Sequence, residues 1–312
     1  MTYPRFILLL LVAVWAIPAS IAQRQLRLPT DEQIQSRLPE GVTFVPNIAY
    51  REGNDAWKLD LAMPSERADS PRAAIVFIHG GGWRNGDKRA GGFLNPTLGY
   101  AAKGYVCVTI NYRLATVAGP SQISRCIEDV KNAVRWLRAN AAKYNIDPNR
   151  IGATGNSAGA HLSVMLGLCP QDAGLEGDGP YQDYSSAVQA VAASATPTSF
   201  LIPMSDRARE RFEQASQQAD EEQLAMARKI SPITYVNADA PPMLLFHEES
   251  DNTVGVYQSD TFIEALRSAG AEDVNYLLLG DGSGHGVFGR NISITEPIRE
   301  AFFARTLAKP SE

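Results

Sequence analysis

The 312-residue sequence has few of the residues that mark specialised binding proteins. It contains 3 cysteines, and none of them has the spacing of a metal site. Lysines and arginines are scattered, the formal net charge is −5, and no basic cluster suggests nucleic-acid binding. There is no internal repeat and no low-complexity tract. We therefore expect no metal site, no nucleic-acid partner and no repeat architecture.

Long apolar runs are also scarce, apart from one at the N-terminus. Arg5 precedes an uncharged apolar stretch at 6–17, a proline breaks it, and the small residues Ser20 and Ala22 follow. This order is typical of a secretory signal peptide, and so short a run is a poor permanent anchor. We expect residues 1–22 to be a signal peptide cleaved after Ala22, with an uncleaved anchor as the alternative. The mature protein is then secreted or periplasmic, with no stable membrane anchor.

The remaining chain alternates between apolar runs and amphipathic segments, and 45% of the sequence is hydrophobic, enough for a large core. The continuous apolar runs at 73–78 and 105–110 are typical of strands buried on both faces. This alternation predicts an α/β fold with a mostly parallel central sheet flanked by helices. The predicted strands are 42–50, 57–62, 73–78, 105–110, 150–154, 188–195, 243–246 and 274–279, and the predicted helices are 121–140, 158–168, 261–268 and 297–307.

The domain organisation follows from this alternation. We expect an N-terminal arm at 23–41 and a single α/β domain at 42–312. Residues 201–230 are charged, Gln-rich and helical, and they predict a small lid insertion over the strand ends, with an ordinary peripheral helix as the alternative. Cys107 lies in an apolar run and is expected to be buried, whereas Cys126 and Cys169 are candidates for a disulfide. The oligomeric state is not indicated.

The run GNSAG at 155–159 lies where a predicted strand turns into a predicted helix. This context is the one that a nucleophile elbow requires, because a tight turn with small flanking residues lifts the serine hydroxyl out of the strand. The following helix N-terminus favours a developing anionic oxygen. A glycine-rich turn that cradles a phosphate is the alternative. We interpret Ser157 as a catalytic nucleophile.

A second motif, HGGGW at 79–83, directly follows a predicted buried strand. Its three glycines leave backbone N–H groups open to a substrate, and they would supply oxyanion donors together with the N–H of Ala158. Trp83 is expected to wall the substrate pocket, and core packing is an equal alternative.

The base must be chosen among 4 histidines, at 79, 161, 247 and 285. His79 leads into the glycine loop and is expected to brace it. His161 lies one helical turn after Ser157 and should point away from the elbow. Because the chain order in an elbow-type hydrolase is serine, acid, histidine, the base must follow Ser157 with room for an acid before it. This order favours His285.

The acid should lie in the loop after the strand at 243–246, which reads HEESDNTV and offers three carboxylates. Asp251 is our choice and Glu249 is second. The role of this acid is to hold the histidine tautomer and to stabilise the imidazolium. A solvated acidic loop without a catalytic role is the alternative.

Taken together, HGGGW at 79–83, NYRL at 111–114, GNSAGAHL at 155–162 and the late aspartate and histidine resemble the hormone-sensitive-lipase-like branch of the α/β hydrolases, especially bacterial feruloyl and acetyl esterases. The resemblance covers about residues 42–308. It implies a carboxylic-ester hydrolase without a cofactor, with a catalytic triad of Ser157, Asp251 and His285. The family's oxyanion donors fall on Gly81, Gly82 and Ala158.

Three stretches depart from the family pattern. The usual His-Gly-Asp-x-Asp is HEESD at 247–251, the usual Val-Pro after it is Val-Gly at 254–255, and the usual Gly-Pro-x-Asp-Leu is TPTSF at 196–200. These changes border the site and leave the substrate open, with small or polymer-attached esters as candidates. The alternatives are an amide-cleaving acyl hydrolase, such as a peptidase or arylformamidase, and a non-catalytic binding protein of the same fold.

Overall fold

The computed structural model describes residues 28–90, 92–116 and 119–309. The predicted signal peptide at 1–22 lies outside the described residues. Within the described part of the chain, the strands form one sheet of eight, in the order β1-β2-β4-β3-β5-β6-β7-β8, and every neighbouring pair from β4 to β8 is parallel. Strand β2 runs antiparallel to both of its neighbours. The predicted mostly parallel sheet is confirmed.

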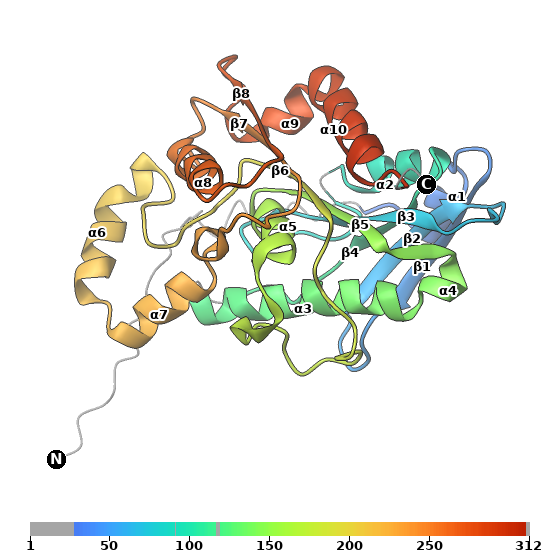
Figure 1. Ribbon diagram of the computed structural model, residues 1–312, viewed down its shortest axis with the longest axis horizontal. Helices are drawn as coiled ribbons and strands as arrows, with labels where there is room; N and C mark the ends of the chain where they lie inside the picture. The colour runs from blue at the N-terminus through green and yellow to red at the C-terminus, as the bar shows by residue number, and fades with distance from the viewer. Residues whose placement is uncertain (1–27, 91, 117–118, 310–312) are drawn as a thin grey trace.

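The secondary-structure elements follow the predicted alternation closely (Figure 1). The strands are β1 (Val42–Ala49), β2 (Lys58–Pro64), β3 (Arg72–Ile78), β4 (Val106–Ile110), β5 (Ile146–Asn156), β6 (Ala190–Ser194), β7 (Met243–Glu248) and β8 (Val274–Leu279). The α-helices are α1 (Asp31–Gln35), α2 (Leu94–Ala102), α3 (Pro120–Ala139), α4 (Ala141–Tyr144), α5 (Ala158–Leu168), α6 (Arg209–Gln218), α7 (Glu221–Lys229), α8 (Tyr257–Ser268), α9 (Val287–Arg290) and α10 (Ile292–Thr306). The 3-10 turns are η1 (Gln171–Ala173), η2 (Asp206–Ala208), η3 (Pro232–Tyr235) and η4 (Gly284–Gly286).

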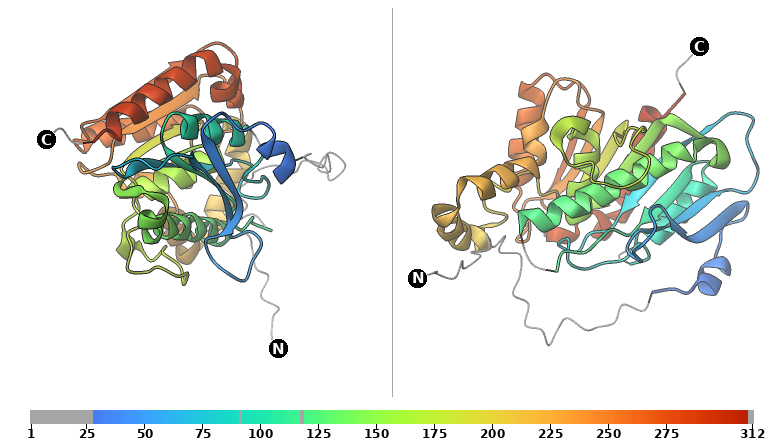
Figure 2. Two further views of the ribbon diagram at one scale, coloured as in Figure 1. Left: turned by 90° about the vertical axis from the view of Figure 1, so that its right-hand side faces the viewer. Right: turned by 90° about the horizontal axis from the view of Figure 1, so that it is seen from below.

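Helices cover both faces of the sheet, because alternate residues of each central strand point to opposite sides. Val76 and Ile78 of β3 pack into the larger core cluster with α3, α5 and α8. Ile75 and Phe77 pack into a second cluster with residues of α2, α9 and α10. The two views in Figure 2 show these helical layers on either side of the sheet. The sheet is therefore buried on both faces, as its continuous apolar runs predict.

The structure corrects several predicted boundaries. Strand β5 begins at Ile146, not at residue 150, and its pairing with β3 is irregular between Arg72 and Ala74, where the Pro148 segment passes. Helix α10 begins at Ile292, so Pro297 lies inside it and not at its start. Helix α2 was not among the predicted helices, because Pro96 and Gly99 interrupt its pattern.

The three cysteines carry no disulfide. Cys107, Cys126 and Cys169 are all buried free thiols, so the candidate bridge between Cys126 and Cys169 is wrong. The Cys126 thiol instead donates to the carbonyl oxygen of Arg113 at 3.2 Å, and the Cys169 thiol donates to that of Pro170.

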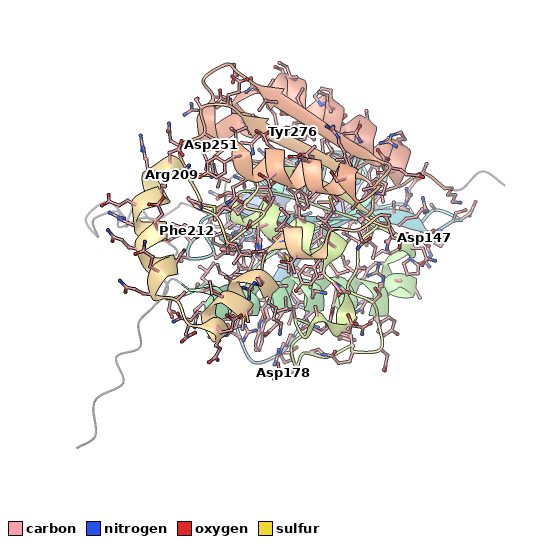
Figure 3. All side chains as sticks on the ribbon, turned by 60° about the vertical axis from the view of Figure 1, so that its left-hand side comes forward. Asp147, Asp178, Arg209, Phe212, Asp251 and Tyr276 are labelled. Atoms are coloured by element: carbon pink, nitrogen blue, oxygen red, sulfur yellow. The ribbon has the colours of Figure 1, made fainter. Side chains whose placement is uncertain are left out.

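The segment at 201–230 forms η2, α6 and α7, and α6 extends away from the sheet (Figure 1). Its beginning meets the loop that follows Asp251, since the Gly255 N–H donates to the Met204 carbonyl oxygen at 2.8 Å. Figure 3 shows Asp251 at the same end of the molecule as Arg209 and Phe212 of α6.

Among the described residues, none of the helices combines the length and the apolar character of a membrane span, and no group of three or more metal-ligating side chains gathers.

Candidate active site

Ser157 occupies the turn between β5 and α5 in a backbone conformation that side chains rarely adopt, with φ 53° and ψ −123°. The turn is held because the Ser157 N–H donates to the Ser194 carbonyl oxygen at 2.9 Å and the His161 N–H donates to the Ser157 carbonyl oxygen at 3.0 Å. A non-glycine residue at positive φ stores strain that the surrounding structure must support. The predicted strand-turn-helix context of a nucleophile elbow is therefore present.

The glycines of GNSAG are required by close backbone approach. A Cβ atom on Gly159 would overlap the carbonyl oxygen of Ile78 and would lie 2.7 Å from that of His79. A Cβ atom on Gly155 would overlap the backbone of Gly159 itself. The elbow is thus pressed against the strand that leads into the glycine loop.

We expect Gly159→Ala to destabilise the fold by at least about 1–3 kcal/mol, because the added methyl group meets rigid backbone atoms. Thermal unfolding followed by circular dichroism measures this effect. Gly99→Ala is the matched control, since a Cβ atom at this helical glycine meets no atom within 4 Å. Equal melting temperatures for the two variants would contradict the steric argument.

The glycine loop turns back on itself after β3. Gly81, Gly82 and Trp83 have φ values of 117°, 60° and 58°. A Cβ atom on Gly81 would overlap the carbonyl of Asn85, and one on Gly80 would lie 2.8 Å from the carbonyl oxygen of Asn156. The loop therefore needs glycine for its conformation and for its contact with the end of β5.

His79 supports this loop and is not placed for proton transfer. Its ring stacks on Tyr112 with the centroids 4.3 Å apart, and its Nδ1 donates to the Gly80 carbonyl oxygen at 2.8 Å. Burial lowers the pKa of His79, so the ring is held neutral.

His161 and Trp83 form a buried pair beneath the elbow. Trp83 Nε1 donates to His161 Nδ1 at 3.2 Å, and His161 Nε2 donates to the Ile230 carbonyl oxygen at 2.8 Å. Burial lowers the pKa of His161 to about 4. Both ring nitrogens are engaged, so His161 is a structural residue. Trp83 also lines the cavity above Ser157, so it packs in the core and walls the pocket at once.

His285 and Asp251 are brought together from two loops at the carboxyl edge of the sheet. His285 lies in η4 after β8, Asp251 follows β7, and His285 Nδ1 donates to Asp251 Oδ2 at 2.8 Å. The other carboxylate oxygen accepts the N–H groups of Thr253 at 2.8 Å and Val254 at 3.1 Å. This arrangement leaves His285 Nε2 as the free acceptor of the ring.

The electrostatics of Asp251 favour its ionised form. Burial alone would raise the pKa of Asp251, but the His247 ring, whose Nε2 lies 3.5 Å from Asp251 Oδ2, the hydrogen bond from His285 and the Thr253 N–H hold it well below its ordinary value, and a protonated His285 lowers it further. The carboxylate therefore stays charged at neutral pH and can stabilise an imidazolium.

The competing residues of this loop have other positions. His247 is fully buried in β7, where its Nε2 donates to the Val254 carbonyl oxygen at 2.9 Å and its Nδ1 accepts from Ser259 Oγ at 2.7 Å. Glu249 is exposed, whereas the Asp251 side chain is completely buried beside His285. Of the two candidate acids, Asp251 and Glu249, only Asp251 contacts His285.

Glu248 is the site residue that the sequence reasoning missed. Strand β7 continues to Glu248, two residues beyond its predicted end, and the Glu248 carboxylate accepts the N–H groups of Gly282 at 3.0 Å and Gly284 at 2.9 Å. It also accepts the N–H and hydroxyl of Ser250 at 2.9 and 2.6 Å. Burial opposes its charge, but these hydrogen bonds lower the pKa of Glu248. Glu248 ties the loop of His285 to the loop of Asp251.

We expect Glu248→Ala to lower kcat for ester substrates about 100-fold with little change in KM, because a loop shift of about 1 Å misplaces His285. Steady-state kinetics on the folded protein measures both constants. Ser250→Ala is the control, since it removes one donor to Glu248 but leaves the bonds to Gly282 and Gly284. A variant that melts earlier yet keeps its kcat would show a purely structural role. Glu248→Gln, which retains an acceptor oxygen, should restore part of kcat.

One cavity of about 830 Å³ brings the candidate residues together. Gly81, Gly82, Trp83, Ser157 and His285 all line it. Ala158 is buried at the first position of α5, where backbone N–H groups have no partner within the helix. Among the described side chains, no hydrogen bond joins the Ser157 hydroxyl to the His285 ring. Such contacts are often long in unliganded enzymes and tighten when substrate binds.

This topology and the elbow at its centre define an α/β-hydrolase fold. A truncated carbohydrate esterase from gut microbiota has the same architecture, with a TM-score of 0.71 and 27% identity over 91% of this chain and 100% of that one. Residues 59–266 match the BD-FAE family, and the chain belongs to it. The resemblance to feruloyl and acetyl esterases is thereby confirmed at the level of the family.

Two curated relatives are Esterase LipQ and Esterase LipC of Mycobacterium tuberculosis. LipQ is 32% identical over 80% of this chain and 62% of its own length. LipC is 33% identical over 75% of this chain and 58% of its own length. The chain thus spans less than two thirds of the length of these relatives.

Proposed function

We propose that this protein is a carboxylic-ester hydrolase in which Ser157, His285 and Asp251 act as a catalytic triad. The observation that carries the proposal is the placement of Ser157 at a strained elbow in one cavity with His285, whose Nδ1 donates to Asp251. The esterase names of LipQ, LipC and the solved carbohydrate esterase support the same reaction class.

In the proposed reaction, His285 Nε2 accepts the proton of Ser157 as its oxygen attacks the ester carbonyl. The backbone N–H groups of Gly81, Gly82 and Ala158 stabilise the oxyanion. His285 then gives the proton to the departing alcohol, and an acyl-serine remains. Water, deprotonated by His285, attacks this acyl group and releases the acid and the free serine. In each of the two steps, every bond that breaks is matched by a bond that forms, and the proposed reaction uses no cofactor.

The proposed substrate is an ester with a small acyl group on an alcohol that reaches the cavity from solvent. Trp83 forms part of one wall, and Met204, which precedes α6, lines another part of the cavity. We propose that the segment at 201–230 acts as a lid over this opening. The likeness to a carbohydrate esterase favours sugar-linked acyl groups as the first compounds to examine.

The test is a substrate screen with the purified protein. Turnover of p-nitrophenyl acetate and butyrate measures ester hydrolysis, and turnover of p-nitroacetanilide measures amide cleavage. Acetylated and feruloylated sugars show whether the protein accepts a sugar as the alcohol part of the ester. We expect turnover of the esters and little or none of the anilide. Exclusive cleavage of the amide would replace the proposal by an amidohydrolase. Failure of a fluorophosphonate probe to label Ser157, with no turnover of any substrate, would favour a non-catalytic binding protein of the same fold.

We also propose that the protein is exported and loses residues 1–22. The charged and apolar N-terminal sequence supports this proposal. Intact mass measurement of the protein isolated from the secreted or periplasmic fraction should give a chain that begins at Gln23. A mass that includes Met1 would contradict cleavage.

A further inference from the structure

Arg84 lies at the mouth of the cavity that contains Ser157 and His285, directly after Trp83 in the chain. Arg84 is exposed, and its side chain forms no ion pair, hydrogen bond or ring contact with another residue in the described part of the chain. A guanidinium presents a rigid fork of N–H donors that matches the geometry of a carboxylate. Arg84 therefore offers both its charge and its donors to a ligand.

The backbone of Arg84 is fixed next to the proposed oxyanion donors. Its N–H donates to the Gly81 carbonyl oxygen at 3.2 Å, and the Asn85 N–H donates to the same oxygen at 3.0 Å. Asn85 also lines the cavity, and its side-chain amide has no hydrogen-bond partner among the described residues. The Arg84 guanidinium thus extends from a hydrogen-bonded turn that includes Gly81, so it can reach another group of the ester that the glycine loop holds.

The charge of this cavity is positive and is not compensated. Among the described residues that line it, none is acidic, and Arg84 and His285 are the basic ones. The Asp251 side chain is completely buried and is engaged with His285. The chain as a whole carries a formal net charge of −5. An anion is therefore attracted to this cavity by a local charge opposite in sign to that of the protein.

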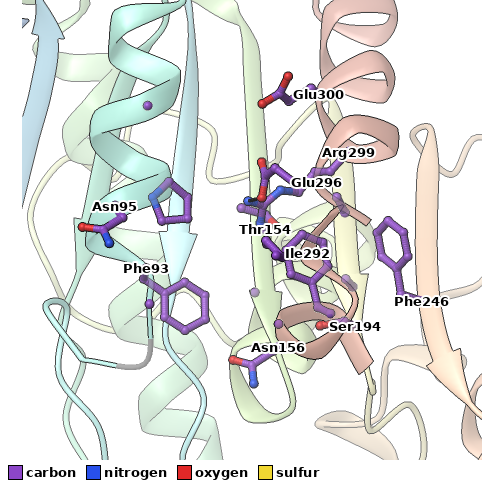
Figure 4. A pocket seen from close by; sticks show the side chains of 18 of the residues that line it. Phe93, Asn95, Thr154, Asn156, Ser194, Phe246, Ile292, Glu296, Arg299 and Glu300 are labelled. Carbon is purple, nitrogen blue, oxygen red and sulfur yellow. Dashed lines mark hydrogen bonds and ion pairs between the residues drawn. The ribbon is translucent and has the colours of Figure 1, made fainter. Parts of the chain in front are cut away.

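The neighbouring cavity, of about 680 Å³, does not suit an anion in the same way. It adjoins the first cavity at His285, and Figure 4 shows it between α2 and α10, the helix that carries Glu296 and Arg299. The carboxylates of Glu296 and Glu300 line it and pair with Arg299 and Lys103. Since an anion meets carboxylates there, the cavity of Arg84 is the one in which a negative charge is stabilised.

The exposure of Arg84 indicates which part of the ester carries this negative charge. In the proposed function a small acyl group lies at Ser157, and the alcohol part extends toward solvent. Leu114 lines the same cavity and is 38% exposed, so it leaves apolar surface uncovered for the body of the alcohol. The exposed guanidinium and this apolar surface together suit an alcohol that has an apolar body and a charged end.

We propose that Arg84 determines specificity, and that the preferred substrate is a small-acyl ester of a phenol or alcohol that carries a carboxylate. The inference rests on the proposed function, since it names the alcohol class for the same site. The Arg84 guanidinium donates to the carboxylate while Ser157 attacks the ester carbonyl. The carboxylate stays at the mouth of the cavity during the reaction and leaves with the alcohol.

The first test compares 4-acetoxybenzoate with its methyl ester, which has the same acyl group and ring but no charge. The readout is the ratio of the two kcat/KM values, because this ratio in a variant and in the natural chain shares the intrinsic reactivity of the compounds. We expect Arg84→Gln to lower the ratio about fivefold, the effect of losing one exposed charge pair. Arg84→Lys should restore part of it, and Arg84→Glu should lower it further.

Arg267→Gln is the matched control. Arg267 is exposed near the end of α8 and does not line the cavity, so its replacement removes the same charge without removing the contact. We expect the ratio in this variant to stay within about twofold of that of the natural chain. Rising salt should lower the ratio in the natural chain but not in Arg84→Gln, because salt screens exposed charges. Equal ratios in the natural chain and Arg84→Gln would overturn the proposal.

The second test measures binding without turnover, by calorimetric titration of Ser157→Ala with the same two compounds. The carboxylate is expected to bind about fivefold more tightly than the methyl ester, and the preference should vanish when Arg84→Gln is added. If the natural chain hydrolyses neither compound but this preference remains, the proposed function fails and the anion site stands. Turnover of both compounds with no preference in kcat/KM or in binding would overturn the anion site and leave the ester hydrolase intact.

Discussion

Ser157→Ala is expected to reduce kcat for p-nitrophenyl acetate by about 10⁶-fold, leaving only the activity that oxyanion donors and substrate binding provide. The reason is that no other hydroxyl occupies the elbow between β5 and α5, and the proposed acyl transfer requires a covalent bond to this oxygen. The measurement is the initial rate of p-nitrophenol release by the purified variant, compared with the spontaneous rate in buffer.

The folded state of this variant must be checked, because Ser157 holds a strained backbone. An unchanged melting temperature shows that the loss lies in the chemistry. Alanine relieves none of the backbone strain, so we expect stability close to that of the natural chain. Retention of more than about a tenth of the activity would refute the nucleophile assignment.

Asp251→Asn is expected to reduce kcat by about 10⁴-fold, because an amide stabilises the wrong histidine tautomer and cannot compensate an imidazolium. In the natural chain Asp251 accepts the Nδ1 proton of His285 at 2.8 Å. The isosteric change keeps the size of the side chain, so the KM for ester should change little.

Glu249→Gln is the matched control for this experiment. Glu249 was the second candidate for the acid, lies two residues before Asp251 and is exposed. We expect its replacement to leave kcat within about twofold, as surface changes usually have small effects. A larger loss in Glu249→Gln than in Asp251→Asn would reverse the assignment of the acid.

The fold was predictable because its signals are local. Continuous apolar strands such as 73–78 can exist only where both faces of a sheet are covered, and the structure covers both. Helix α2 was harder, since Pro96 and Gly99 weaken its local preference and its contacts with the sheet supply the stability instead. The start of β5 was hidden for a similar reason, because Pro148 reads as a stop signal.

In the candidate site, too, the features set by local sequence could be predicted and those set by distant contacts could not. The elbow and the glycine loop depend on backbone geometry that only small residues allow, so their sequences reveal them. The role of Glu248 depends on hydrogen bonds to residues 34 and 36 positions away, which no short pattern encodes. A signal was nevertheless present, since Glu248 replaces the glycine of the related His-Gly-Asp-x-Asp motif.

The three buried thiols can be used to detect local unfolding of this chain. A thiol reagent can reach Cys107 only when α2 or α10, which cover its face of the sheet, moves away, and Cys126 and Cys169 only when α3 or the end of α5 moves away. Burial also raises the pKa of each thiol, which suppresses the reactive thiolate in the folded state. The rate at which each cysteine becomes labelled in rising denaturant therefore gives a site-by-site map of local unfolding in the natural chain, without any mutation.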